Sequence, residues 1–105
     1  MTGTRLILVT TSPRAEAKRI AHALVEERLA ACVNLISDVH SVYRWKETVE
    51  TADEVLLLIK TRQEKVDAVR ARVHELHSYD LPEFLVLDVA DGSDAYLEWI
   101  GASVR

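Results

Sequence analysis

Glycine, proline, cysteine and aromatic residues are all scarce in this sequence. Its 105 residues include 3 glycines, 2 prolines and 1 cysteine, and aromatic residues make up 6%. So few glycines leave little material for a loop that cradles a phosphate. The single cysteine, Cys32, cannot form an internal disulfide, which indicates a reducing, cytoplasmic setting.

An excess of positive charge and long apolar runs are also lacking. The chain carries 13 basic and 17 acidic side chains, a formal net charge of -4. This balance argues against binding to nucleic acid or to an anionic membrane surface through a basic field. No uninterrupted apolar run is longer than residues 55–59, and a run of that length is far too short to span a bilayer. The first residues lead directly into a strand-like run, so no signal peptide is expected.

The composition that is present is typical of a globular protein, with 49% apolar and 29% charged residues. It excludes a disordered or low-complexity chain. The sequence shows no internal repeat, linker or biased segment, and its length suits one domain. We therefore expect a single domain over residues 1–105.

Hydrophobic periodicity predicts four strands and three helices in the order β-α-β-β-α-β-α. The strands are expected at residues 6–9, 32–46, 49–60 and 84–89, and the helices at residues 13–26, 66–76 and 96–100. Ser12 suits the N-cap of the first helix, with Pro13 at its first position. Thr61 and Glu64 have the spacing of a capping box before the second helix.

The middle of the chain predicts an unusually long hairpin. Apolar residues of segment 32–46 occupy odd positions and so share one face: Val33, Leu35, Val39, Tyr43 and Trp45. Two serines interrupt the series, so a bulge in this strand is an open alternative. Arms of about 12–15 residues would extend roughly 40–50 Å. Such arms would overhang the helices, and a neighbouring subunit could pair with their free edges.

Right-handed crossovers place both long helices on one face of a four-stranded antiparallel sheet. The predicted fold class is therefore α+β, ferredoxin-like βαββαβ, with a short C-terminal helix. The other face would be polar if it met water, yet the strands at 6–9, 55–59 and 84–87 are apolar on both faces. Strand centres can simply be apolar on both sides. We favour self-association, because large exposed apolar patches are rare on soluble monomers.

Five short strings occur in one recognisable order along nearly the whole chain. They are LAACVN at 29–34, SVYRWK at 41–46, EVLLLIKT at 54–61, HSYDLPE at 77–83 and YLEWI at 96–100. In this ordered set the chain resembles the CutA divalent-cation tolerance family. The resemblance implies a ferredoxin-like fold, a tight homotrimer, a cytoplasmic setting, a response to metal ions and links to copper and other divalent metals. It also implies a PII-like architecture, in which trimers bind small effectors in clefts between subunits.

The chain departs from the family pattern near the expected cleft. Ser78 stands where the family usually has proline, and Asp80 stands where glutamate or glutamine is common. Thr10 and Leu76 occupy positions where some members carry a cysteine and a second histidine. A copper site built from those groups would be incomplete here.

Six residues are expected to form a cleft or ligand site: Cys32, Tyr43, Trp45, Lys60, Tyr79 and Glu83. Cys32 is either a reactive thiol or a small buried hydrophobe. Tyr43 and Trp45 either stack on a ligand or pack across a subunit boundary. Lys60 ends an apolar strand and needs a partner, for which Glu83 is the candidate. That pair is either an anion-binding or proton-transfer site or a salt bridge within a trimer.

His77 is the expected metal ligand. His74 lies three residues earlier and would share its helix face, and imidazole suits Cu²⁺. With few nitrogen ligands in reach, we expect Cu²⁺ or another divalent cation to bind weakly, and we expect no organic cofactor.

Two functions from different classes follow. The first is a non-enzymatic, trimeric binding or regulatory protein of divalent metal (copper) tolerance, with no nucleic-acid or membrane partner. The alternative is an enzyme or small-effector-binding signalling protein that uses an intersubunit cleft around Lys60, Tyr79 and Glu83. The sequence offers no activated nucleophile and no zinc-spaced cysteines, so the first is preferred and no catalytic residue is assigned.

Overall fold

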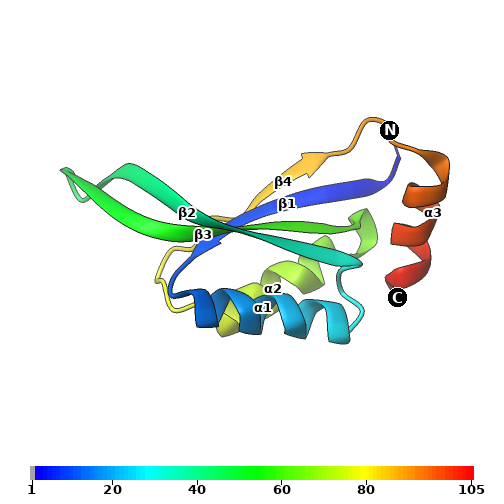
Figure 1. Cartoon of the computed structure of the whole chain (residues 1–105), viewed down its shortest axis with the longest axis horizontal. Helices are drawn as coiled ribbons and strands as arrows, with labels where there is room; N and C mark the ends of the chain where they lie inside the picture. The colour runs from blue at the N-terminus through cyan, green and yellow to red at the C-terminus, as the bar shows by residue number, and fades with distance from the viewer. Residues whose placement is uncertain (1) are drawn as a thin grey trace.

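The computed structural model describes residues 2–105 (Figure 1). Its elements follow one another in the predicted order, with a short 3-10 helix, η1 (Gln63–Lys65), before the second α-helix. The strands are β1 (Thr4–Thr11), β2 (Cys32–Trp45), β3 (Thr48–Arg62) and β4 (Leu85–Asp88). The α-helices are α1 (Arg14–Glu26), α2 (Val66–Leu76) and α3 (Asp94–Ser103).

The four strands form one antiparallel sheet in the order β2-β3-β1-β4. Helices α1 and α2 lie together on one face of this sheet, whereas α3 lies at one end of it, near both termini (Figure 1). The predicted ferredoxin-like α+β fold is therefore confirmed. Alternate residues of the two central strands form the core against the helices, and the apolar ones with no exposed surface are Ile7, Val9, Leu57 and Ile59.

The two predicted helix beginnings need correction. Pro13, one residue later than the expected Ser12, occupies the N-cap position of α1, and no side chain caps this helix. Thr61 does not begin a capping box, because it lies within β3 and its hydroxyl donates to the carbonyl oxygen of Leu29 at 2.6 Å. Glu64 forms a surface ion pair instead of returning to a helix N-terminus.

A β-bulge exchanges the two faces of β2 halfway along the strand. Ser37 and Asp38 together stand opposite the single residue Val55, and Asp38 has a φ of 63°. Before the bulge the odd-numbered residues of β2 face the helices, and after it they face the helix-free side. The bulged alternative is thus confirmed. The expectation that all the odd-numbered apolar residues share one face is wrong, because the extra residue shifts the alternation by one.

Leucines cover the face of the sheet that carries no helix. Leu8 pairs directly with Leu58 of β3 and with Leu85 of β4, and directly paired residues point to the same face. Leu85 is 55% exposed. We call this surface the leucine face, and it consists of Leu6, Leu8, Leu56, Leu58, Leu85 and Leu87. The expected second apolar face is therefore present, and its burial by further copies of the chain stays a prediction.

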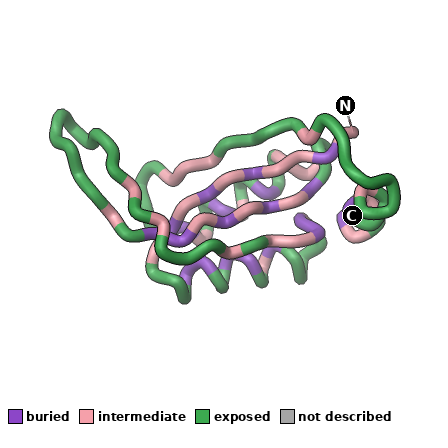
Figure 2. Tube along the Cα trace, turned by 45° about the horizontal axis from the view of Figure 1, so that its top comes forward, coloured by how far each residue is buried: buried purple, intermediate pink, exposed green. Residues whose placement is uncertain are grey.

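The hairpin formed by β2 and β3 extends well beyond the helices, and its outer part is exposed (Figures 1 and 2). Its arms have 14 and 15 residues. Trp45 pairs with Thr48, so the turn consists of Lys46 and Glu47 alone, with φ values of 49° and 68°. This left-handed region costs a non-glycine residue roughly 1–2 kcal/mol. The hairpin is therefore held together by its strands and not by its turn.

Candidate functional site

A cavity of about 880 Å³ opens on the helix-free side of the hairpin, where the loop after α2 meets β3. Its walls are acidic and aromatic, and among residues 2–105 no lysine, arginine or histidine lines it. The acidic lining residues are Glu50, Glu54, Asp80 and Glu83, and the aromatic ones are Tyr43, Trp45 and Tyr79. We call it the acidic cavity. One chain thus brings four of the six expected site residues together without help from a neighbour.

Tyr79 and Glu54 are joined in this cavity by a hydrogen bond. The Tyr79 hydroxyl donates to Oε2 of Glu54 at 2.8 Å, and Glu54 is only 8% exposed. Burial raises the pKa of Tyr79, and the hydrogen bond to Glu54 raises it further. The phenol therefore stays protonated and keeps donating, so it satisfies a carboxylate that would otherwise be costly to bury.

Glu83 lies near the same carboxylate. Burial raises the pKa of Glu83, the charge of Glu54 raises it further, and a hydrogen bond from Thr10 lowers it in part. Two carboxylates in one partly buried site favour protonation of one of them. The cavity therefore favours a positively charged group, which would relieve the repulsion between Glu54 and Glu83.

Glu83→Gln is expected to make the protein more stable at pH 7. Because the folded-state pKa of Glu83 lies above its ordinary value of 4.5, ionisation of this group favours the unfolded chain. The gain in the free energy of unfolding should be complete above the folded-state pKa of Glu83. It should disappear as the pH falls below about 4.5, where the carboxyl is protonated in both states. Urea unfolding midpoints at pH 7 and pH 4 measure it, with Asp80→Asn as the control at an exposed lining position. A lower midpoint at pH 7 would contradict this expectation and would indicate a cation beside Glu83 that the described part of one chain does not supply.

A buried carboxylate holds the loop that carries Tyr79. Oε2 of Glu16 accepts hydrogen bonds from the Thr11 hydroxyl, the Ser78 N–H at 3.2 Å and the Ser78 hydroxyl at 3.1 Å. Burial by itself would raise the pKa of Glu16, but these hydrogen bonds hold it below its ordinary value. Glu16 therefore ties the start of α1 to the loop beside the cavity. Ser78 supplies two donors there, its N–H and its hydroxyl, and a proline would lack both.

His77 does not have the surroundings expected of a metal ligand. Its side chain has no exposed surface. Its Nε2 donates to the carbonyl oxygen of Thr10 at 2.7 Å, and its Nδ1 accepts from the N–H of Tyr79 at 3.1 Å. Both ring nitrogens are thus engaged. Helix α2 ends at Leu76, so the expectation that His74 and His77 share a helix face is wrong.

Lys60 and Cys32 lie at the other end of the sheet from the acidic cavity. The two residues pair directly across β3 and β2, and the Lys60 ammonium lies 3.2 Å from the Tyr96 hydroxyl of α3. The predicted proximity of Lys60 to Glu83 is therefore wrong within one chain. Cys32 is partly exposed, and its thiol lies 3.8 Å from the side-chain oxygen of Asn34.

Two carboxylates at the centre of this arrangement were not predicted from the sequence. Glu54 immediately precedes the apolar run at 55–59, two residues before the leucine face begins in β3. Glu16 stands four residues before Ile20 and eight before Leu24, within the buried stripe of α1. The sequence signal for both Glu54 and Glu16 is a charged residue that falls at the spacing of the apolar residues along its strand or helix.

Two features that residues 2–105 lack bear on metals and membranes. No group of three or more His, Cys, Asp or Glu side chains is arranged to hold a metal ion within that part of the chain. No helix in the same part is both long and apolar enough to cross a membrane.

Known proteins resemble this chain both in sequence and in structure. Residues 5–103 match the family described as CutA1 divalent ion tolerance protein. The divalent-cation tolerance protein CutA of Thermus thermophilus is 43% identical over 95 residues, which cover 90% of this chain and 92% of that protein. The chloroplastic CutA of Arabidopsis thaliana is 42% identical over 100 residues, which cover 95% of this chain and 55% of that protein.

A solved structure agrees with these sequence matches. The crystal structure of CutA from Xylella fastidiosa superimposes with a TM-score of 0.96 at 40% identity, and the match covers 98% of this chain and 99% of that one. This chain spans about half the length of the Arabidopsis relative, and nearly all of the two bacterial ones. The family match over almost the full chain, together with the fold, shows that this chain belongs to the CutA1 divalent ion tolerance family.

Proposed function

We propose that this protein is a non-enzymatic homotrimer that binds divalent cations, Cu²⁺ among them, as part of metal tolerance. The observation that carries the proposal is the acidic cavity. It holds the carboxylates of Glu54 and Glu83 close enough for the charge of one to raise the pKa of the other. No basic side chain of residues 2–105 lines it.

The leucine face supports assembly into a trimer. Its six leucines lie on the side of the sheet away from α1 and α2, and two of them are exposed by 42% and 55%. Because each of these two side chains is already about half buried, covering it completely would stabilise an assembly by about 1 kcal/mol. The acidic cavity opens on the same side of the sheet, so assembly would bring a neighbouring subunit close to the cavity.

The carboxylates, and not His77, are the metal ligands in this proposal. Cu²⁺ at His77 Nδ1 would have to displace the hydrogen bond from the Tyr79 N–H. Glu54 and Glu83 offer oxygen donors without that loss, and water would complete the coordination. Two carboxylates make a weak site, and Cu²⁺ should occupy it better than other first-row divalent metals.

Native mass spectrometry combined with Cu²⁺ titration calorimetry tests the proposal. Protein purified without added metal should appear as a trimer, and calorimetry should give one weak Cu²⁺ site per subunit. Glu83→Gln should weaken that site about tenfold or more, because one of its two carboxylate ligands is lost. His22→Ala, which removes an exposed imidazole, is the control and should leave the site unchanged. Equal losses in both variants, or an unchanged isotherm for Glu83→Gln, would contradict the assignment.

A second candidate function rests on the position of Lys60. Within residues 2–105 its polar contact is with Tyr96 and not with a carboxylate. In a trimer, Lys60 of one subunit could complete the acidic cavity of the next and produce the intersubunit cleft of Lys60, Tyr79 and Glu83. Such a cleft would bind a small effector or carry out chemistry. A small organic anion retained in the native mass spectrum would favour this function over cation binding.

We place the protein in the cytoplasm, because one unpaired cysteine suits a reducing compartment. The Arabidopsis relative is named as chloroplastic, so the family is not confined to one compartment. Oxidation of Cys32 in protein isolated without reductant would argue against the assignment.

A further inference from the structure

A buried imidazole joins two residues that line the acidic cavity. The side chain of His77 has no exposed surface, and His77 is not itself a lining residue. Its Nε2 donates to the carbonyl oxygen of Thr10 in β1 at 2.7 Å, and its Nδ1 accepts from the N–H of Tyr79 at 3.1 Å. Thr10 and Tyr79 both line the cavity. His77 therefore connects the strand wall and the loop wall of the cavity from the protein interior.

The two residues that His77 holds are each hydrogen-bonded to one of the cavity carboxylates. The Tyr79 hydroxyl donates to Oε2 of Glu54 at 2.8 Å. The side chain of Thr10 is hydrogen-bonded to Glu83 on the other side. The positions of both carboxylates thus depend on groups that the same imidazole holds in place.

Two contacts from His77 orient Tyr79. The N–H of Tyr79 bonds to the side chain two residues before it, the pattern that an Asx turn uses to fix a loop backbone. The two rings also pack together, with centroids 4.6 Å apart and an interplanar angle of 59°, a separation at which aromatic rings attract. Backbone and ring of Tyr79 are therefore both held, and its hydroxyl is directed to Glu54.

The hydrogen-bond partners fix the form of this imidazole. A carbonyl oxygen only accepts, so Nε2 carries a proton, and a backbone N–H only donates, so Nδ1 carries none. Oε2 of Glu16 lies 3.7 Å from Nδ1 and would attract a proton there, but it already accepts three hydrogen bonds. The imidazole of His77 is therefore neutral, and its one lone pair is used by the N–H of Tyr79.

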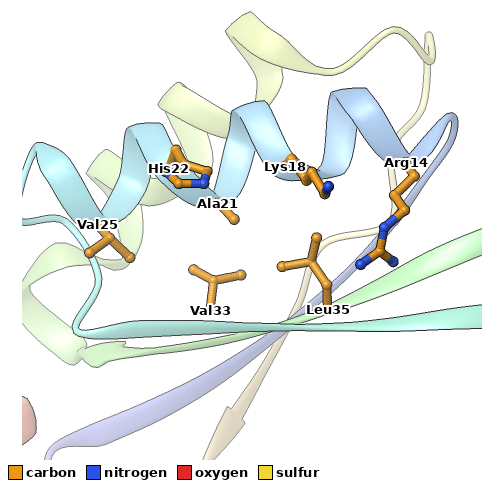
Figure 3. A pocket seen from close by; sticks show the side chains of 7 residues that line it. All are labelled: Arg14, Lys18, Ala21, His22, Val25, Val33 and Leu35. Atoms are coloured by element: carbon orange, nitrogen blue, oxygen red, sulfur yellow. The ribbon is translucent and has the colours of Figure 1, made fainter.

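His22 shows the opposite case. It lines a groove of about 440 Å³ between α1 and β2, on the side of the sheet that carries the helices (Figure 3). Its imidazole is exposed in one chain and forms no hydrogen bond or ion pair with any of residues 2–105. Removing it should leave the acidic cavity unchanged, so His22→Ala is the control for the loss of a histidine.

We propose that His77 is a positioning residue for the acidic cavity. Its neutral imidazole, with the proton on Nε2, fixes Tyr79 and Thr10. Through these two residues it sets the separation of Glu54 and Glu83, and so it determines how tightly the cavity holds a cation. This role rests on the proposed function only for the identity of the bound ion, because the contacts themselves exist in the metal-free chain.

Two substitutions separate the two halves of the imidazole. His77→Asn places an amide oxygen near the position of Nδ1, where it can accept from the Tyr79 N–H as in an Asx turn. His77→Gln places an amide nitrogen near Nε2, where it can donate to Thr10, and lacks the acceptor at Nδ1. His77→Ala removes both halves.

Amide hydrogen exchange of the metal-free protein, measured by NMR, tests the positioning role. The Tyr79 N–H should exchange about fivefold to tenfold faster in His77→Ala and His77→Gln than in the wild type, as for the loss of one hydrogen bond. In His77→Asn it should stay within twofold of the wild type. The amide of Val69, within α2, is the reference for opening of the whole fold. Unchanged exchange in His77→Ala, or no recovery in His77→Asn, would overturn the proposal.

Cu²⁺ titration calorimetry then separates positioning from direct metal binding. His77→Ala and His77→Gln should weaken the site about tenfold, as is typical for residues that orient metal ligands, and His77→Asn should restore most of this loss. An equal loss in all three variants would show that the imidazole itself binds the metal, which would overturn the proposal. Val73→Ala removes buried volume from the same helix and, like His22→Ala, should leave the Cu²⁺ affinity within twofold.

The two measurements also distinguish this proposal from the proposed function. A wild-type protein that binds no Cu²⁺ would contradict cation binding by the acidic cavity. The exchange rate of the Tyr79 N–H in the three His77 variants would still decide the positioning role, because no metal enters that measurement. A loss of Cu²⁺ affinity in Val73→Ala as large as that in His77→Ala would show that lost packing and not the imidazole is responsible, and would also overturn the proposal.

Discussion

Glu16→Ala should lower the free energy of unfolding by about 2–4 kcal/mol. The substitution removes the acceptor of three hydrogen bonds, two from Ser78 and one from Thr11. Thr11 has no exposed surface, so its hydroxyl cannot turn to water for a replacement partner. A buried donor left without an acceptor costs about 1–3 kcal/mol, and the cavity left by the side chain adds to that cost.

The same carboxylate should make stability depend on pH in a definite direction. The folded-state pKa of Glu16 lies below its ordinary value of 4.5, so folding favours the ionised form. Its contribution is complete above about pH 4.5 and is lost as the pH falls through the folded-state pKa. Glu16→Gln should remove this part of the acid sensitivity while it keeps most of the side-chain volume.

Urea unfolding at fixed protomer concentration measures both effects, since assembly makes apparent stability depend on concentration. The control is Glu26→Ala, an exposed glutamate at the other end of the same helix, for which a change within about 0.5 kcal/mol is expected. If the two alanine variants unfolded at the same urea concentration, Glu16 would not hold the loop beside the cavity.

Leu58→Glu should weaken assembly by more than about a hundredfold and leave the chain folded. Leu58 lies at the centre of the leucine face, opposite Leu8, and points away from the core beneath α1 and α2. A charge at this position would be buried in a trimer and exposed in a monomer, and an unpaired buried charge costs several kcal/mol. In a trimer the substitution occurs three times, so the losses accumulate.

Sedimentation equilibrium and circular dichroism separate assembly from folding. Leu57→Glu introduces the same charge one residue earlier on the core side, where Leu57 has no exposed surface, and should unfold the chain outright. Ala68→Glu on the exposed side of α2 should do neither. A wild-type protein that sediments as a stable folded monomer at micromolar concentration would contradict the proposed trimer and the role of the leucine face.

The elements of the fold could be predicted because each carries a clear local period. The apolar stripe of α2 repeats Val66, Val69 and Val73 at helical spacing, and the structure has a helix there. The long hairpin followed from alternation alone. The bulge could be anticipated, but its effect on side-chain direction could not. The extra residue shifts the alternation by one and so moves Tyr43 and Trp45 to the other face of the sheet.

The arrangement of the site was harder to predict because it depends on strand direction. β3 and β4 both pair antiparallel with β1, so they run in the same direction. Lys60 near the end of β3 and Glu83 before the start of β4 must therefore lie at opposite ends of the sheet. His77 illustrates a second limit. Periodicity continued past Leu76, but the backbone leaves the helix there and turns the imidazole inward.

The two left-handed residues at the tip of the hairpin also bear on the order in which the chain folds. A turn that costs roughly 1–2 kcal/mol at each of Lys46 and Glu47 cannot nucleate strand pairing from the tip. Pairing should begin at the base, where Leu57 and Ile59 are buried against the helices, and extend outward as the last cooperative unit to form. Tyr43 and Trp45 stand on that late part, so the walls of the acidic cavity are completed only after the core has folded.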